Sequence, residues 1–275
     1  MYIYLMNLSN TYGQLEDYLA KLQASGRYWF TLSEAEKELN TSSKSIHKQL
    51  VPLARKKKMV MIRKEFYAII APEFRINGAP PVTYYIDGLM KTLNRSYYIS
   101  LLNAAAWYGA AHQQPQKYSI VVHRPYLPPI KKDYARVDFI YKSQWDNKDI
   151  VQQKTNAGYV NTSSSELTAL DLCYYSKRAG GINHVATVLQ ELAEEINPQT
   201  LEEVAGRFSS LMAVQRLGYL LEFLGHPEKA HPLKEWLNNQ KHHAALLDPG
   251  VNDSSSKVTG NDWKIIVNTE IDPDL

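Results

Sequence analysis

The sequence predicts an α+β fold, in which an N-terminal winged helix-turn-helix precedes a larger mixed α/β domain with a helical C-terminal half. Two observations predict it. The first 72 residues contain three stretches of helical periodicity and then two apolar runs around a turn, which is the order of a winged helix. Beyond them, strand-like runs precede a series of helical patterns. We therefore expect a winged helix over residues 1–72, a linker over 73–81 and a second domain over 82–275.

Two helices are predicted before residue 41. The first ends near Gly26 and has an apolar stripe with helical spacing, formed by Leu15, Tyr18, Leu19 and Leu22. Thr31 and Glu34 have the spacing of a capping box, in which a hydroxyl and a carboxylate accept hydrogen bonds from free backbone amides. The sequence therefore predicts that a second helix begins at Thr31.

A third helix is predicted to begin at Ser42 or Ser43, with Ile46, Leu50 and Leu53 as its apolar stripe. Pro52 lacks a backbone donor and clashes with the preceding turn, so we expect this helix to end or kink near Val51. Two short strands around a turn at residues 63–65 are predicted within residues 59–70.

Positive charge is concentrated in this N-terminal part. The chain has a formal net charge of +3, whereas residues 1–72 contain 11 Lys or Arg and 6 Asp or Glu. A basic block on a nearly neutral body is typical of a domain that binds a polyanion. In a helix-turn-helix, the start of the second motif helix faces base edges, and flanking basic residues contact phosphates. The DNA-contacting residues predicted on this basis are Ser42, Ser43, Lys44, Ser45, His47, Lys48, Arg55, Lys57, Lys58, Arg63 and Lys64. A winged helix used only for protein contacts is the alternative.

The remaining pattern predicts a linker and then the second domain. The linker is indicated by Pro72, Gly78, Pro80 and Pro81. Strands are predicted over residues 118–123, 137–141, 159–162 and 263–267, with a polar loop over 251–260. Helices are predicted over residues 89–93, 97–111, 166–175, 184–195, 201–208, 214–224 and 233–247.

Other groups of residues argue only weakly for a catalytic or metal site. The spacing of His226, His231, His242 and His243 matches no metal-ligand motif, so we expect neither a metal nor a cofactor. Asp138, Asp149 and Lys154 suggest a metal-dependent nuclease core, and such a nuclease, targeted by the winged helix, is the alternative function. The single cysteine, Cys173, lies in an apolar run and is expected to be a buried hydrophobe. Residues 97–111 fall short of the ~20 that span a membrane, so a cytoplasmic protein is expected.

The chain resembles the AbiEi family of antitoxins, from bacterial abortive-infection toxin–antitoxin systems, over nearly its whole length. No single motif decides the match, which depends on the order of several motifs along the chain. They lie at residues 66–74, 85–90, 97–106, 109–116, 165–172 and 215–222.

The resemblance implies a non-enzymatic protein with two activities. The winged helix would bind double-stranded DNA at inverted repeats in its own promoter and repress the operon. The C-terminal domain would counteract a nucleotidyltransferase toxin encoded in that operon, by direct binding or indirectly. Among the exposed polar positions expected on the matched helices, the residues chosen for this antitoxin activity are Gln215, Arg216 and Glu222. His112, Gln113 and Gln116 are a similar, conspicuous polar group.

Overall fold

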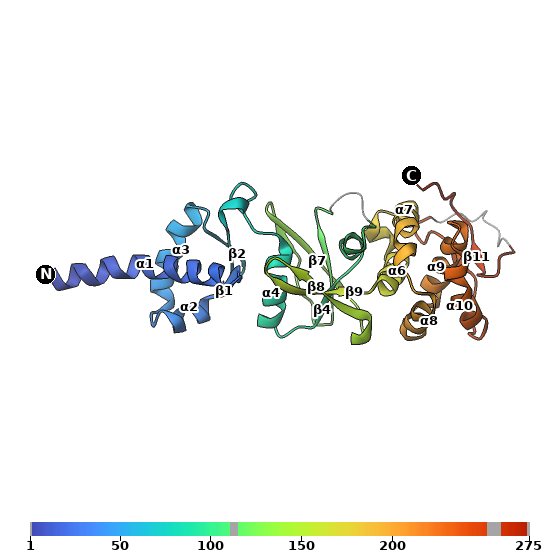
Figure 1. The fold of residues 1–275 in the computed structure, drawn as a ribbon, viewed down its shortest axis with the longest axis horizontal. Helices are drawn as coiled ribbons and strands as arrows, with labels where there is room; N and C mark the ends of the chain where they lie inside the picture. Colours follow the sequence, from blue (N-terminus) through green and yellow to red (C-terminus); the bar gives the residue numbers. More distant parts are fainter. Residues whose placement is uncertain (1, 111–114, 252–259, 274–275) are drawn as a thin grey trace. The chain divides into compact units, whose positions relative to one another are not determined.

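The computed structural model describes residues 2–110, 115–251 and 260–273, and it has a mixed α/β architecture (Figure 1). His112 and Gln113 therefore lie outside the described residues. The chain divides into two compact units. Unit 1 comprises residues 1–97, 125–139 and 152–160, and unit 2 comprises residues 98–124, 140–151 and 161–275. The sequence places its boundary at the linker 73–81, whereas two later segments group with the N-terminal part in the structure.

Unit 1 begins with helices and a three-stranded antiparallel sheet. Its elements are α1 (Tyr2–Ala24), β1 (Trp29–Thr31), α2 (Leu32–Glu38), α3 (Ser43–Arg55), β2 (Met59–Arg63) and β3 (Phe66–Ile69), and the strand order is β1-β3-β2. Leu15 and Leu19 of α1 pack with Ile46 and Leu50 of α3 in one buried cluster. The helical stripes predicted from the sequence therefore form the core of this region.

The ends of these helices follow the predicted signals, with one exception. The capping box of Thr31 and Glu34 is present at the start of α2. Helix α3 begins at Ser43 with Ser42 as its cap. The expected end near Val51 is wrong, because α3 continues through Pro52 to Arg55. Burial of Leu50 and Leu53, both 5% exposed, outweighs the one backbone hydrogen bond that Pro52 cannot donate.

The predicted linker is structured and leads into a short helix. A 3₁₀ helix spans Pro72–Phe74, another spans Val82–Tyr84, and α4 covers Ile86–Thr92. Gly88 of α4 lies directly against the indole of Trp29, and a Cβ at Gly88 would come within 2.0 Å of that ring. Because only glycine allows this approach, the motif at residues 85–90 fixes α4 onto β1.

A six-stranded sheet follows, in the order β6-β7-β5-β4-β9-β8. Its strands are β4 (Tyr97–Ile99), β5 (Tyr118–Val122), β6 (Ile130–Lys132), β7 (Ala135–Tyr141), β8 (Ile150–Thr155) and β9 (Gly158–Ser163). Strands β6 and β7 are antiparallel, with Ile130 opposite Val137, while β4 and β9 are parallel, with Ile99 opposite Thr162. The predicted strands at 118–123, 137–141 and 159–162 correspond to β5, β7 and β9.

The helix predicted over 97–111 is wrong in its first part. Residues 97–99 form β4, and α5 (Leu102–Ala105) and a 3₁₀ helix (Ala106–Tyr108) come after it. Leu101 has a φ of 55°, which interrupts the chain between strand and helix. Apolar runs of this length are ambiguous by periodicity, and the aromatic residues Tyr97 and Tyr98 favour a strand.

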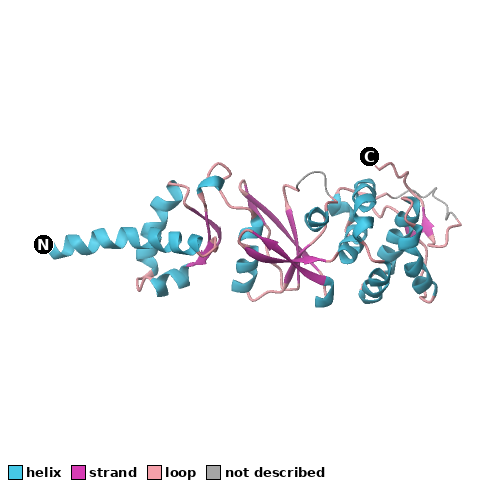
Figure 2. Ribbon diagram, in the orientation of Figure 1, coloured by secondary structure: helices cyan, strands magenta, loops and turns pink. Residues whose placement is uncertain are grey.

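The C-terminal part of the chain is mainly helical, as Figure 2 shows. Its helices are α6 (Ser165–Tyr174), α7 (Ile182–Leu192), α8 (Pro198–Arg207), α9 (Leu211–Phe223) and α10 (Pro227–Asn238). The helix predicted over 233–247 ends at Asn238, and β10 (Ala245–Leu246) pairs in parallel with β11 (Ile265–Ile266). Most of the predicted loop 251–260 lies outside the described residues.

The core of unit 2 surrounds α6 and α9. Leu170, Leu217 and Leu221 are fully buried in this cluster, together with Cys173 as expected. Trp263, also fully buried, lies against Gly218 of α9, where a Cβ would come within 2.0 Å of the indole ring. Residues near the C-terminal end of the chain therefore pack against α9 and are part of the same core.

Candidate functional site

The outer face of helix α3 carries polar and basic side chains. The hydroxyl of Ser42 accepts a hydrogen bond from the backbone N–H of Ser45 at 3.4 Å, which fixes the start of the helix. Burial of Ile46 and Leu50 turns the opposite face outward. None of the residues of α3 is acidic. We call the exposed residues of this face the α3 surface: Ser42, Ser43, Lys44, His47 and Lys48.

The basic residues after α3 have different environments. Arg55 and Lys57 are exposed, as the DNA-binding interpretation requires. Lys58 is less exposed and forms an ion pair with Glu16 of α1. This pair lowers the pKa of the Glu16 carboxyl. Lys58 therefore already has a carboxylate partner within unit 1 and contributes less positive charge to the surface than the sequence predicts.

The tip of the β2–β3 hairpin also differs from the prediction. Lys64 has 92% of its side chain exposed and lies at the turn. The guanidinium of Arg63 instead donates a hydrogen bond to the backbone carbonyl of Pro128, and it lies 5.4 Å from the ring centroid of Phe139. Lys64 is accordingly accessible at the tip, whereas Arg63 is held by the segment 125–139 of the same unit.

The edge of strand β2 is covered by the same segment. Because β2 is an outer strand of its sheet, its free backbone groups need other partners. The carbonyl of Met61 accepts hydrogen bonds from Lys132 Nζ at 2.8 Å and from the Tyr134 hydroxyl at 3.3 Å. The hairpin formed by β6 and β7 therefore holds β2 in place.

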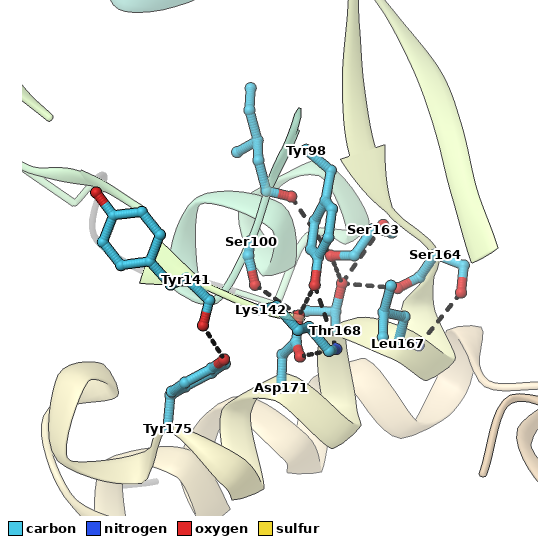
Figure 3. A network of polar contacts seen from close by, with 11 residues as sticks. Tyr98, Ser100, Tyr141, Lys142, Ser163, Ser164, Leu167, Thr168, Asp171 and Tyr175 are labelled. Atoms are coloured by element: carbon cyan, nitrogen blue, oxygen red, sulfur yellow. Dashed lines mark hydrogen bonds and ion pairs between the residues drawn. The ribbon is translucent and has the colours of Figure 1, made fainter. Parts of the chain in front are cut away.

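A buried polar network occupies the centre of unit 2 (Figure 3). Lys142 Nζ lies 2.8 Å from Asp171 Oδ1, and the two side chains are only 6% and 0% exposed. Asp171 Oδ2 accepts hydrogen bonds from the Tyr98 hydroxyl at 2.8 Å and from Ser100 Oγ at 2.9 Å. Burial and the charge of Asp171 raise the pKa of Tyr98, so its phenol stays a neutral donor. The network joins β4, β7 and α6.

The residues chosen for antitoxin activity are not on an open surface. Gln215 and Arg216 are 1% and 6% exposed, so the expectation that they are exposed is wrong. Gln215 Nε2 donates to the carbonyls of His243 at 2.9 Å and Trp263 at 2.8 Å. Arg216 Nε donates to the carbonyl of Leu246 at 2.8 Å.

Like Gln215 and Arg216, Glu222 forms a hydrogen bond with a residue near the C-terminal end of the chain. Its carboxylate accepts a hydrogen bond from the Trp263 indole at 2.8 Å and pairs with Lys234 at 2.9 Å. Gly218, between these residues on α9, admits the Trp263 ring. Each polar residue of the motif at 215–222 therefore has a partner near the C-terminal end of the chain. Together they hold residues 243–246 and Trp263 against α9.

The residues considered for a nuclease do not form a metal centre. Arg207 Nη2 donates to Asp149 Oδ1 at 2.6 Å, so this carboxylate is held by a guanidinium. Within residues 2–110, 115–251 and 260–273 there is no group of three or more His, Cys, Asp or Glu side chains suited to a metal ion. In the same ranges, no helix is long and apolar enough to cross a membrane.

Comparison with known proteins identifies the region that contains the network and α9. Residues 98–223 match the family described as the AbiEi antitoxin C-terminal domain. Residues 98–223 are therefore an AbiEi antitoxin C-terminal domain. The match supports a role for this chain as the antitoxin of a toxin–antitoxin system. The fold is similar to that of the Rv2827c protein from Mycobacterium tuberculosis, with a TM-score of 0.67 and 17% identity over 92% of this chain and 90% of that chain. No curated protein gives a significant match.

Sequence reasoning did not predict the buried ion pair of Lys142 and Asp171. Lys142 and Asp171 are 29 residues apart and show no motif spacing. One signal was available: Asp171 lies among apolar residues on a helix, where a charged side chain requires a partner. That pattern identifies Asp171 as buried and paired, although it does not identify Lys142 as the partner.

Proposed function

We propose that this antitoxin is a non-enzymatic, cytoplasmic protein that also binds double-stranded DNA at inverted repeats in its own promoter and represses the operon. In this proposal, unit 1 is a winged helix and α3 is its recognition helix. The toxin that it counteracts is a nucleotidyltransferase from the same operon. The antitoxin role comes from the matched family, and the remaining parts are our inference.

The α3 surface is the observation that carries the DNA-binding part. A recognition helix must present hydrogen-bonding side chains near its N-terminus without carboxylates that repel phosphates. The α3 surface has three serine or histidine side chains and two lysines, all exposed, on a helix without acidic residues. Serine can bond several base edges, and lysine suits guanine or phosphate.

The order of elements supports the same proposal. The helix, strand, two helices and two strands from α1 to β3 follow one another as in a winged helix. The β2–β3 hairpin then corresponds to the wing, with Lys64 exposed at its tip. Arg55 and Lys57 add exposed positive charge next to α3. Basic groups at these positions would neutralise phosphates on either side of the groove that α3 reads.

A gel-shift experiment tests this proposal. The full-length protein is titrated into its own upstream DNA and into a scrambled duplex of equal length, at two salt concentrations. We expect selective binding whose logarithm falls with log salt at a slope of roughly −4 to −5, for ~5 phosphate contacts. Equal binding to both duplexes, or none to either, would show that unit 1 does not recognise the promoter.

Two substitutions test whether α3 forms the contact with the promoter DNA. Lys44→Ala should weaken binding to the promoter by roughly tenfold, the cost of about one base or phosphate contact. Lys177→Ala removes the same charge from an exposed residue of unit 2 and serves as the control. If the two variants bind the promoter equally well, the recognition surface is not on α3.

The relation to the toxin is tested separately. We propose indirect antagonism, without a stable complex, so tagged antitoxin and untagged toxin should elute separately at moderate salt while co-expression still restores growth. Co-elution would replace indirect antagonism with direct binding. Loss of promoter binding in Lys44→Ala should leave growth rescue intact, because α3 lies outside the matched antitoxin domain.

A further inference from the structure

Unit 2 contains a cavity that neither the antitoxin role nor the proposed promoter binding explains. Its volume is about 420 Å³, within the range of roughly 300–1,000 Å³ typical of small-molecule sites. Its walls are formed by the end of β7, the end of α6, the segment after α8 and the segment after β5. The residues that matter are Arg124, Tyr141, Lys142, Tyr174, Tyr175 and Ser209, and we call this space the tyrosine cavity.

The tyrosine cavity is suited to an anion. Arg124 is exposed at its edge and supplies a guanidinium, which binds phosphate through two parallel hydrogen bonds. Lys142 lines the wall, but its charge is balanced by Asp171 at 2.8 Å. None of the described residues that line the cavity is acidic. The net charge at this wall is therefore positive, with Arg124 as its accessible part.

The cavity also offers an aromatic surface held in position. Tyr174 is 41% exposed, although it is a large ring next to the core. It contacts Tyr175 edge to face at a centroid distance of 4.6 Å, and Phe208 at 5.8 Å. These two contacts restrict the ring while leaving part of it open to solvent. A restricted, accessible tyrosine is the kind of group on which nucleobases stack.

The remaining wall is rigid and provides neutral hydrogen-bonding groups. Burial raises the pKa of Tyr175, so its hydroxyl stays protonated, and it donates to the carbonyl of Tyr141 at 3.5 Å (Figure 3). Lys142 Nζ also lies 4.2 Å from the centroid of Phe208. The Lys142–Asp171 pair thus joins β7 to α6 directly behind the cavity, which lowers the cost of ordering the walls when a ligand binds.

We propose that the tyrosine cavity binds one nucleotide, with its phosphate on Arg124 and its base against Tyr174. A nucleotide satisfies both features, since it combines an anion with a flat aromatic ring. An acidic peptide would use Arg124 and leave Tyr174 without a matching group. The same chemistry is present in a free nucleoside monophosphate and in the 5′-phosphorylated end of an RNA strand.

Calorimetric titration of the full-length protein tests the inference. The probes are AMP, GMP, adenosine, inorganic phosphate and a 5′-phosphorylated RNA trinucleotide. We expect a nucleoside monophosphate to bind at least ~tenfold more tightly than adenosine or phosphate alone, because each of these lacks one charged or stacking contact. Tighter binding of the trinucleotide than of AMP and GMP would identify a strand end as the ligand, and equal binding would identify a free nucleotide.

Variants connect this binding to the cavity. Arg124→Ala should weaken it by roughly 10–100-fold through loss of the charged hydrogen bonds. Tyr174→Ala should weaken it by roughly 5–100-fold through loss of stacking. Arg136→Ala and Tyr159→Ala are the controls, because they remove an exposed arginine and an exposed tyrosine outside the cavity. Both should bind the nucleotide with the affinity of the unchanged protein. Ser209→Trp fills the cavity and should abolish binding, with the thermal unfolding midpoint measured to confirm that each variant folds.

Three results would overturn the proposal. The first is no heat of binding with any nucleotide or RNA probe. The second is unchanged affinity in both Arg124→Ala and Tyr174→Ala. The third is an acidic hexapeptide that binds as tightly as the nucleotides, which would show that the cavity recognises charge alone. Because the cavity lies in unit 2 and α3 in unit 1, the gel-shift result and this one are independent.

Discussion

Helices α3 and α9 both carry polar side chains in their N-terminal halves, but those side chains have opposite environments. On α3, Lys44 and Lys48 are exposed to solvent. On α9, Gln215 and Arg216 are buried and donate to backbone carbonyls of residues 28 to 48 positions later in the chain. A polar side chain on a helix therefore indicates a binding surface only when no later segment covers it.

The difference follows from what each helix packs against. The apolar stripe of α3 packs against α1 and the neighbouring core. The polar face of α3 therefore remains exposed to solvent. Helix α9 has fully buried residues such as Ala213 and Leu217 and lies in the middle of its unit. Polar groups in such a position must be hydrogen-bonded, because burying them unpaired is costly.

The largest effect is expected from Asp171→Ala, which removes a buried polar partner from α6 in the same unit as α9. Removing the carboxylate leaves the Lys142 ammonium buried without its partner, at a cost of about 3–5 kcal/mol in the free energy of unfolding. Urea denaturation of the full chain, followed by tryptophan fluorescence, measures it. The double variant with Lys142→Met removes both charges and should recover most of the loss. A single variant as stable as the unchanged protein would mean that Lys142 reaches water.

A smaller effect is expected from Gln215→Ala. It leaves the carbonyls of His243 and Trp263 without their donor, which should cost about 1–3 kcal/mol. Gln199→Ala removes the same side chain from an exposed position on α8 and is the control. Equal unfolding midpoints for the two variants in urea would contradict the role of Gln215 in holding His243 and Trp263 against α9. Growth rescue by folded Gln215→Ala is measured as well. Intact rescue would indicate a structural role for Gln215, and lost rescue would indicate a direct antitoxin role.

The pH dependence of unit 1 provides an intermediate test. Burial raises the pKa of Glu34, but hydrogen bonds from Arg27 and Thr31 outweigh it and lower that pKa below its ordinary value of 4.5. Because the folded pKa is the lower one, the stabilisation is present above pH 4.5 and is lost as the pH falls through the folded value. Glu34→Gln should therefore flatten the decline in stability below pH 4.5, measured by urea titrations at several pH values. Glu36→Gln on the same helix is the control, and an unchanged slope in Glu34→Gln would refute the assignment.

The smallest effect on stability is expected from Lys44→Ala. Its side chain is exposed, so the free energy of unfolding should change by less than about 0.5 kcal/mol even if promoter binding weakens. Thermal unfolding of Lys44→Ala next to Gln215→Ala measures the contrast between the two helices directly. Destabilisation comparable to that of Gln215→Ala would show that Lys44 supports the fold rather than a ligand.

Local signals in the sequence located most elements near the N-terminus. The capping box at Thr31, the cap at Ser42 and the stripe at Ile46, Leu50 and Leu53 act within one or two turns, so they could be recognised without knowledge of the tertiary structure. Periodicity could not assign Tyr97–Ile99, because the spacing of a short apolar run does not distinguish a buried strand from a buried helix.

The exposure of a candidate site residue could be predicted from the sequence only where no distant segment of the chain packs against it. Exposure of the α3 surface follows from periodicity alone. The contact of Arg63 with Pro128 depends on a segment 65 residues away, and that of Gln215 with Trp263 spans 48 residues. No local pattern contains such pairings. Arg63 was therefore assigned to DNA and Gln215 to an exposed surface from sequence.

The composition of unit 1 from three separate stretches of chain has a consequence for synthesis on the ribosome. The unit uses residues up to 97, but it also requires 125–139 and 152–160. At ~5–20 residues per second, residues 132–134 emerge roughly 2–7 seconds after residue 97. Until then, strand β2 lacks the hydrogen bonds from Lys132 and Tyr134 to Met61. The nascent chain therefore passes through an interval with an uncovered strand edge, in which pairing with another chain competes with folding.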